Sequence, residues 1–221
     1  MSNRLRVSAA VAACALPCAA SLAKIAIGTS NNFNNGETGN WSNGAVTDPI
    51  VLPGGPAAPT DPYLRVSSDG SGAGGKLTVF NNGDDWTGLW LTAGITHVEM
   101  DFRNFDPQGR TLHMRMGFLV SAGQGQPGWC TAAFAVPADG QWHHAVFTIS
   151  EATMTRVGNA FDWETALQWV TQVRIFHSTN PSVVGTNFAS SVGIDNIIAL
   201  PGPGAAAVLL LGSAAALRRR R

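Results

Sequence analysis

Two acidic residues in one alternating segment are the most direct candidates for chemistry. Glu99 and Asp101 flank Met100 in a run of alternating polar and apolar residues, so both carboxylates lie on the same face of a β-strand. Retaining glycoside hydrolysis uses two carboxyl groups about 5 Å apart, one as nucleophile and one as acid. The solvated face of a half-buried strand explains the pair equally well without catalysis. We predict no catalytic residue and keep a glycan hydrolase that uses Glu99 and Asp101 as an alternative.

Tryptophan is the second feature, since saccharides dock their apolar faces on exposed aromatic rings. The chain has seven tryptophans and one tyrosine. Trp86 and Trp90 stand beside Asp85 in a turn-rich stretch, and Trp129 follows a Gly/Gln-rich segment. We predict that these four residues form a saccharide-binding site. Aromatic side chains dominate core packing, so we expect the other tryptophans to fill the core. These are Trp41, Trp142, Trp163 and Trp169.

Histidine offers no comparable site. His143 and His144 are adjacent, and adjacent side chains of a strand point to opposite faces, so the two cannot chelate one ion together. The sequence contains no HExxH motif, phosphate loop, GxSxG motif or Cys-His arrangement.

β-Strands must position these side chains, because apolar residues recur at every second place along much of the chain. The strongest strand candidates are residues 63–66, 76–80, 98–102, 112–118, 145–149, 173–177 and 194–200. Only residues 151–154 and 162–169 are predicted to be helical, the second with Asp162 as its N-cap. The pattern predicts an all-β fold, a two-sheet antiparallel β-sandwich of the jelly-roll type with one or two short helices.

The first 23 residues have the layout of a secretory signal peptide. Arg4 and Arg6 precede an apolar, small-residue stretch from Val7 to Ala20, and Ser21-Leu22-Ala23 is the best cleavage site. An Ala-rich run without a polar face is unsuited to a helix of the folded domain. A lipoprotein signal at Cys18 is an alternative, although the proline directly before it makes a poor lipobox.

The last 21 residues contain three ordered parts, namely a Pro/Gly motif, an apolar run from Ala205 to Leu217 and a basic end. The motif consists of Pro201, Gly202, Pro203 and Gly204, and the basic end of Arg218, Arg219, Arg220 and Arg221. As a helix the apolar run reaches about 20 Å, short of a ~30 Å hydrocarbon core. The arginines hold such an end in the cytoplasm. We expect a transmembrane sorting helix that retains the chain briefly, with a permanent anchor as the alternative.

The neutral charge of the whole chain conceals an acidic domain. Six of the 14 Lys and Arg residues lie in the two end segments, whereas all 14 Asp and Glu residues lie between them, so residues 24–200 carry a net charge of −6. Such a domain has no basic surface for nucleic acid or anionic lipid. Only Cys130 remains of three cysteines, so no intramolecular disulfide can form. Its apolar surroundings favour a buried thiol.

The C-terminal segment resembles the PEP-CTERM sorting signal of bacteria that make extracellular polymer. The resemblance lies in the order of proline motif, apolar helix and basic end over residues 201–221, with Pro-Gly-Pro-Gly where Pro-Glu-Pro is usual. It implies an exosortase-type processing enzyme as partner. It also implies a final location at the cell surface or in the extracellular matrix.

The segment between the ends resembles the carbohydrate-binding-module-like, or galactose-binding-like, jelly rolls of such exported proteins. The likeness rests on NNFNNGETGNWSNG, YLRVSSDGSGAGGKLTVFNNGDDWTG, GQWHHAVFTIS and VGIDNIIAL. In similar jelly rolls an early acidic residue and an aspartate of the last strand share a calcium ion. Asn34 and Asp195 occupy these places here, which implies one structural calcium ion. The alternative is that Asp195 and Asn196 satisfy backbone groups. Laminarinase-type glucanases, also jelly rolls, carry three acids on one strand, and here Arg103 or Asn104 stands at the third place.

These features predict an exported bacterial protein with a signal peptide at 1–23, a β-sandwich domain at 24–200 and a sorting tail at 201–221. We expect it to pass through the general secretory pathway, with transient retention in the inner membrane. We expect it to bind extracellular polysaccharide without catalysis. A structural or adhesion protein of the matrix, with no small ligand, is the alternative.

Overall fold

Antiparallel pairing joins all the strands that the alternating pattern predicts. The computed structural model describes residues 25–43, 48–121 and 127–202. Sheet A contains β1 (Ser30–Asn31), β2 (Ile50–Pro53), β3 (Pro62–Ser68), β5 (Ile95–Asn104), β9 (Trp142–Thr148) and β12 (Ser190–Pro201). Sheet B contains β4 (Thr78–Asn81), β6 (Leu112–Leu119), β7 (Gly128–Cys130), β8 (Phe134–Val136), β10 (Thr155–Val157) and β11 (Gln172–His177).

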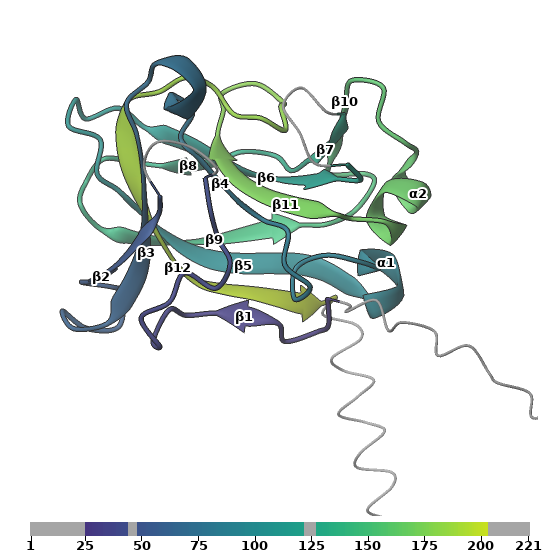
Figure 1. Cartoon of the computed structure of the whole chain (residues 1–221), viewed down its shortest axis with the longest axis horizontal. Coiled ribbons are helices and arrows are strands. Elements are labelled where there is room, and N and C mark those ends of the chain that lie inside the picture. Colours follow the sequence, from purple (N-terminus) through teal and green to yellow (C-terminus); the bar gives the residue numbers. More distant parts are fainter. Residues whose placement is uncertain (1–24, 44–47, 122–126, 203–221) are drawn as a thin grey trace, which may run out of the picture.

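The two sheets form the two layers of a β-sandwich (Figure 1). The strand order is β2-β3-β12-β5-β9 in sheet A, where β1 also pairs with β12. In sheet B the order is β10-β7-β6-β11-β4, and β8 also pairs with β6. The protein is therefore an all-β, two-sheet antiparallel sandwich of the jelly-roll type, as predicted.

Two short helices, α1 (Trp90–Ala93) and α2 (Trp163–Gln168), lie at one end of the sandwich (Figure 1). The predicted cap of α2 is confirmed, because the Asp162 side chain accepts a hydrogen bond from the Thr165 backbone N–H at 2.8 Å. The helix predicted at residues 151–154 is wrong. This segment is a hydrogen-bonded turn. A single 3₁₀ turn, η1, spans Gly72–Gly74.

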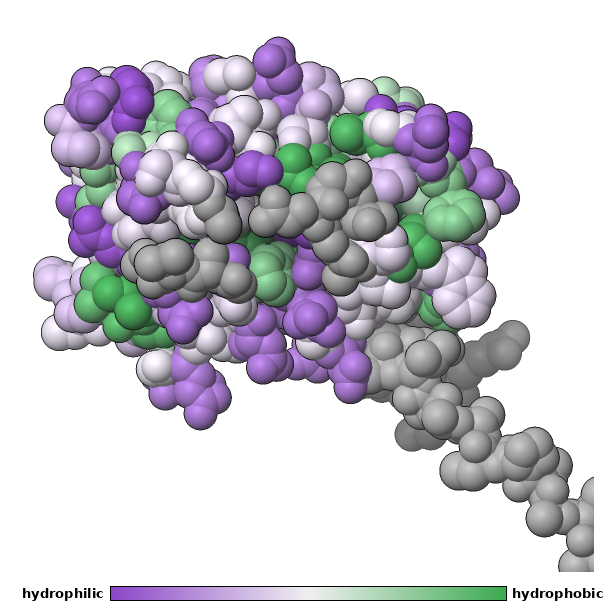
Figure 2. Space-filling model, turned by 45° about the horizontal axis from the view of Figure 1, so that its top comes forward, coloured by the Kyte–Doolittle hydropathy of each residue, from purple (hydrophilic) through white to green (hydrophobic). Residues whose placement is uncertain are grey.

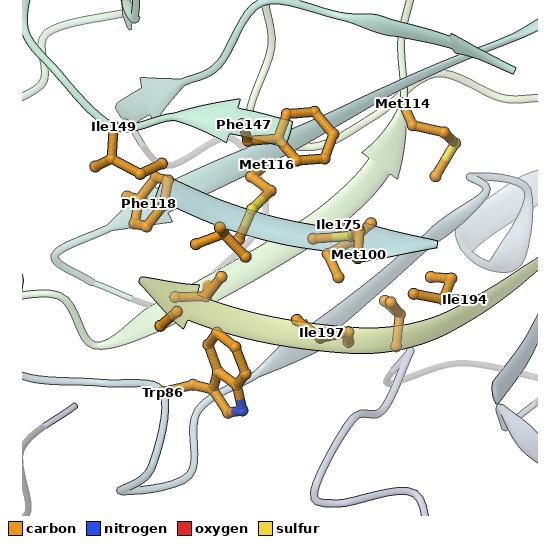
Figure 3. Packing of buried hydrophobic residues seen from close by; sticks show 14 of the residues in the cluster. Trp86, Met100, Met114, Met116, Phe118, Phe147, Ile149, Ile175, Ile194 and Ile197 are labelled. Carbon is orange, nitrogen blue, oxygen red and sulfur yellow. The ribbon is translucent and has the colours of Figure 1, made fainter. Parts of the chain in front are cut away.

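The core lies between the sheets, on the strand faces that the alternation assigns to apolar residues. Met100 of β5 and Met114, Met116 and Phe118 of β6 are each at most 1% exposed. Figure 3 shows these side chains pointing into the space between the two layers, together with Ile175 of β11. Their burial from water is the main force that holds the layers together.

The outer face of sheet B is covered by residues 178–188. Val183 of this segment packs against Leu119, Cys130 and Phe176. Cys130 is thereby fully buried, as predicted. Burial also raises the pKa of its thiol. β6 and β11 are therefore buried on both faces along most of their length.

Within the described ranges, no helix has the length and apolar character that crossing a membrane requires. The predicted signal peptide and the predicted tail helix lie outside the described residues, as do Pro203, Gly204 and the four C-terminal arginines. Of the Pro/Gly motif, Pro201 and Gly202 are described. Pro201 is the last residue of β12 and pairs with Ile95 of β5.

Candidate functional site

The three tryptophans that we predicted to bind a saccharide are buried, so this prediction is wrong. Trp86, Trp90 and Trp129 are 1%, 0% and 7% exposed. A saccharide needs an open ring face, and none of the three rings offers one. Figure 3 shows the Trp86 ring among the buried apolar side chains. Their turn-rich surroundings suggested exposure, but the rings belong to the main core.

Hydrogen bonds inside the protein explain how tryptophans from loops become buried. The Oδ1 atom of Asn31 accepts hydrogen bonds from the indole N–H of Trp41 at 2.9 Å and of Trp86 at 2.6 Å. The indole N–H of Trp129 donates to the backbone oxygen of Phe161 at 3.0 Å. A buried indole needs such a partner for its one polar group. Distant residues supply these partners, so burial carries no unsatisfied donor here.

Trp169, which we expected in the core, is 55% exposed. It follows α2, whose buried face consists of Trp163, Ala166 and Leu167. Trp169 is three residues after buried Ala166, so a continued helix would place it on the buried face. The helix ends at Gln168, however, and the backbone of Trp169 is non-helical (φ −133°, ψ 40°), so no helical spacing in the sequence indicates its exposure.

The remaining tryptophans follow the prediction in part. Trp41 and Trp163 are buried as predicted, whereas Trp142 is half-buried. Few large apolar side chains are exposed in the described part of the chain. They are Ile27, Ile50, Val146, Phe161 and Trp169. On the face shown in Figure 2, hydrophobic groups form small patches separated by hydrophilic side chains.

Trp169 lies in a groove of about 330 Å³, which we call the Trp169 groove. Gly88 and Val170 join its two sides through reciprocal backbone hydrogen bonds of 2.7 and 3.2 Å. The apolar wall is formed by Leu89, Val120, Trp169 and Val170. The polar side chains at the groove are Asn82, Asp84, Thr87 and Thr171. One exposed ring beside several hydrogen-bonding groups is the composition of a small-molecule site.

A polar hollow of about 650 Å³ adjoins this groove and shares Asn82 and Asp84 with it. Asn40 and Asp85 also line this hollow, and both are exposed. Of the four residues that we predicted to bind a saccharide, Asp85 alone therefore stays at an open surface. The loop therefore borders the hollow and the groove, but the exposed ring there is that of Trp169 and not of Trp86 or Trp90.

Glu99 and Asp101 share one face of β5, as predicted, and both contact His144 of β9. The Nε2 atom of His144 is 3.3 Å from Glu99 Oε2, and its Nδ1 atom is 3.0 Å from Asp101 Oδ1. Asn196 also donates a hydrogen bond to Asp101 at 2.8 Å. Asn104, at the place of a third acid, is buried and donates to two backbone oxygens. The two carboxylates are joined through one exposed histidine, which differs from a separate nucleophile and acid.

The predicted pairing of Asn34 with Asp195 is not found among the described residues. Asn34 is exposed in a turn. Asp195 is fully buried, and its Oδ2 atom has no hydrogen-bond partner. Its neighbour is Asp61, since a Cβ atom at Gly55 would lie 2.5 Å from Asp61 Oδ2 and 3.0 Å from Asp195 Oδ2. Burial raises the pKa of Asp195 to about 7, and the nearby carboxylates of Asp61 and Asp101 add to the effect.

Metal-binding groups are sparse in the described part of the chain. It contains no group of three or more His, Cys, Asp or Glu side chains placed to hold a metal ion. His143 and His144 contact different carboxylates, and His143 bonds to Asp139 at 2.9 Å. The convergent oxygens of Asp61 and Asp195 suit either a shared proton or part of an oxygen ligand set. The calcium ion stays a prediction.

Comparison with known proteins supports the fold and no specific family. No protein-family model matches the sequence. No curated protein matches it either. An exo-β-agarase structure is 10% identical with a TM-score of 0.51; the match covers 78% of this chain and 24% of the agarase, so this chain spans about a quarter of that protein.

Two further structures have TM-scores below 0.5. A carbohydrate-binding module of family 28, specific for non-crystalline cellulose, is 11% identical with a TM-score of 0.49, and the match covers 76% of this chain and 91% of the module. A K1 adhesin domain of Lys-gingipain from Porphyromonas gingivalis is 12% identical with a TM-score of 0.45, with coverage of 78% and 97%. The names span an enzyme, a binding module and an adhesin, and such low identity bears on fold alone.

Proposed function

We propose that this chain is a non-catalytic polysaccharide-binding module that holds its ligand in the Trp169 groove. The observation that carries this proposal is the 55% exposed ring of Trp169, set in a groove beside Asn82, Asp84 and Thr171. The apolar face of a sugar ring stacks on the indole. The amide, carboxylate and hydroxyl groups around it accept and donate hydrogen bonds to sugar hydroxyls.

The charge of the groove favours a neutral saccharide. Asp84 is the charged residue among its described lining, and Asp85 joins it in the adjoining hollow. The domain as a whole also carries a net charge of −6 between its end segments. A carboxylated or sulfated polymer would be repelled here by like charge.

A binding role accounts for the surface better than hydrolysis. Glu99 and Asp101 are held by His144 on the outer face of sheet A. The groove carries Asp84 as its acid among the described residues. A retaining glycosidase needs two carboxyl groups across the scissile bond, and neither location provides that arrangement in an enclosed cleft.

The test is affinity electrophoresis of the full-length protein in gels that contain agarose, cellulose derivatives or xylan. Trp169→Ala removes the proposed platform, and truncation of a central tryptophan contact costs about 2 kcal/mol or more, so binding should weaken at least about 30-fold. Phe161→Ala is the matched control, because Phe161 is 56% exposed and lies before the same helix. We expect it to bind like the wild type.

Equal retention of the Trp169→Ala and Phe161→Ala variants would contradict the site. A wild-type protein that no neutral polysaccharide retains, but that partitions with the polymer fraction of the cell surface, would instead support a structural or adhesion role. Release of reducing sugar ends would support the hydrolase alternative.

We further infer export and sorting from the two end segments. Arg4 and Arg6 with the apolar run behind them support entry into the secretory pathway, and residues 201–221 support recognition by an exosortase-type enzyme at the inner membrane. The intact mass of the secreted protein tests both steps. We expect a chain that begins near Lys24 and ends before Ala205, and a mass that includes the four terminal arginines would contradict removal of the tail.

A further inference from the structure

Two arginines on the outer face of sheet A lack a counter-charge in the described part of the chain. Arg65 of β3 and Arg103 of β5 stand on either side of Gly193 of β12 in the strand register. Their neighbours Leu64 and Phe102 face the core, so the alternation turns both arginines outward. Neither guanidinium forms an ion pair or hydrogen bond with the described residues. The Nε atom of Arg103 is buried without an acceptor.

One aromatic ring holds both charges. The guanidinium carbon of Arg65 lies 4.7 Å from the centroid of the Phe105 ring, and that of Arg103 lies 5.1 Å from it. The Phe105 ring in turn stacks on the buried Tyr63 at a centroid distance of 6.0 Å. Two positive charges held at one ring repel each other, and an anion bound at both relieves this repulsion. The pair is therefore arranged for a negatively charged ligand.

A hollow of about 520 Å³ opens beside Arg103, between residues 54–59 and 140–142. Arg103 is the charged residue in its described lining. The half-buried Trp142 lines it too, and the indole N–H donates to the backbone oxygen of Gly54 at 3.1 Å, which fixes the ring. The exposed amide of Gln141 completes the set. A preorganised ring, an amide and a guanidinium thus meet at one opening.

The acids near the hollow have other partners. Asp61, beside Gly55, accepts a hydrogen bond from the Ala57 backbone N–H at 3.0 Å. Asp101, two places before Arg103, is bonded to His144 at 3.0 Å. Asp139, beside the 140–142 segment, is bonded to His143 at 2.9 Å. None of these carboxylates forms an ion pair with Arg103, so the Nη atoms of its guanidinium have no acidic partner among the described residues.

We propose that this surface binds an anionic saccharide, a sugar unit that carries a carboxylate or sulfate group. Arg103 donates hydrogen bonds to the anionic oxygens, Arg65 adds a second positive charge, and the Trp142 ring contacts the face of the same sugar. The site lies by β2 and β3, at the end of the sandwich away from α1 and α2 (Figure 1). It goes beyond the proposed function and does not depend on the Trp169 groove. In an acidic domain, this local pair is what overcomes repulsion of an anionic polymer.

The test is affinity electrophoresis of the full-length protein in gels that contain polygalacturonate, dextran sulfate or neutral dextran. Loss of a charge-assisted hydrogen bond should raise the dissociation constant for an anionic polymer about tenfold or more in Arg103→Gln. Arg156→Gln is the matched control, since it removes the same charge from an exposed arginine of β10. We expect it to bind like the wild type, and any retention by neutral dextran should be the same for all of these proteins, because neither substitution touches the Trp169 groove.

Each outcome decides for or against the site. Stronger retention by polygalacturonate assigns a carboxylate, and stronger retention by dextran sulfate assigns a sulfate. No retention of the wild type by either polymer, or equal affinity of Arg103→Gln and Arg156→Gln, would overturn the proposal. Thermal unfolding checks that each variant is folded, and Arg65→Gln replaces Arg103→Gln if the latter is not. Trp169→Ala should leave anionic binding unchanged, which separates failure here from failure of the Trp169 groove.

Discussion

Asn31 allows a quantitative test of why the loop tryptophans are buried. Its Oδ1 atom is the acceptor for two indole N–H groups, those of Trp41 at 2.9 Å and Trp86 at 2.6 Å, and both tryptophans are 1% exposed. Asn31→Leu keeps the number and branching of the side-chain heavy atoms but removes the acceptor. A buried donor left without a partner costs about 1–3 kcal/mol, so two donors predict a loss of about 2–6 kcal/mol in the free energy of unfolding.

Urea unfolding of the full-length protein, followed by tryptophan fluorescence and circular dichroism, measures this loss. Asn31→Asp retains an acceptor oxygen and should lose less stability than Asn31→Leu. Asn35→Leu is the control, because Asn35 is exposed and its bonds are local, to Glu37. A surface substitution of this kind is expected to change stability by at most about 1 kcal/mol.

Hydrogen exchange gives a second readout. The two indole protons of the wild type should exchange slowly, because both are buried and bonded. The reasoning is refuted if Asn31→Leu is as stable as Asn35→Leu, or if the indole protons of Trp41 and Trp86 exchange at the rate of exposed indoles. Fast exchange would mean that water reaches these rings, and equal stability would mean that the Asn31 acceptor is not what keeps them buried.

Two further predictions concern sheet A. Burial raises the pKa of Asp195 to about 7. The folded state therefore keeps a proton that the unfolded chain loses above about pH 4. Between about pH 4 and 7 the free energy of unfolding of the wild type should fall by up to about 4 kcal/mol relative to that of Asp195→Asn, with no further change above this range. Urea unfolding of both proteins in EDTA measures this difference, and parallel profiles of stability against pH would contradict the prediction. Buried His177, whose pKa is lowered to about 4, has the opposite pH dependence, but it contributes equally to both proteins and so cancels. Gly193→Ala would place a Cβ atom 2.8 Å from the Trp142 ring. This overpacking should lower the free energy of unfolding by about 1–3 kcal/mol, measured by thermal unfolding. An unchanged melting temperature would show that the ring moves freely.

The β-sandwich was predictable because its signal is local. Along residues 98–102 of β5 and 112–118 of β6 each second residue is apolar, and Met100 and Phe118 are buried where this period places them. Backbone geometry alone turns alternate side chains of a strand to opposite faces. The cap of α2 at Asp162 was predictable for the same reason, since its partner Thr165 is three residues away.

Which residues of the candidate surface are exposed was predictable only in part, because exposure depends on distant residues. The loop with Asp85 lines an open hollow. The neighbouring Trp86 is buried because Asn31, 55 residues earlier, accepts its indole hydrogen bond. No pattern within the loop itself contains that information. The three-residue spacing from buried Ala166 predicts burial of Trp169, and only the end of α2 at Gln168 leaves this ring outside the buried face.

The sequence by itself therefore determined the strand faces, the sandwich class and the acidic balance of residues 24–200. Tertiary structure decided which tryptophan is open, and it brought Asp61 to Asp195 and Arg65 to Arg103. The reason is physical. Periodicity follows from the backbone geometry of a few neighbouring residues, whereas exposure and charge proximity depend on which remote strands pair and which segments cover them.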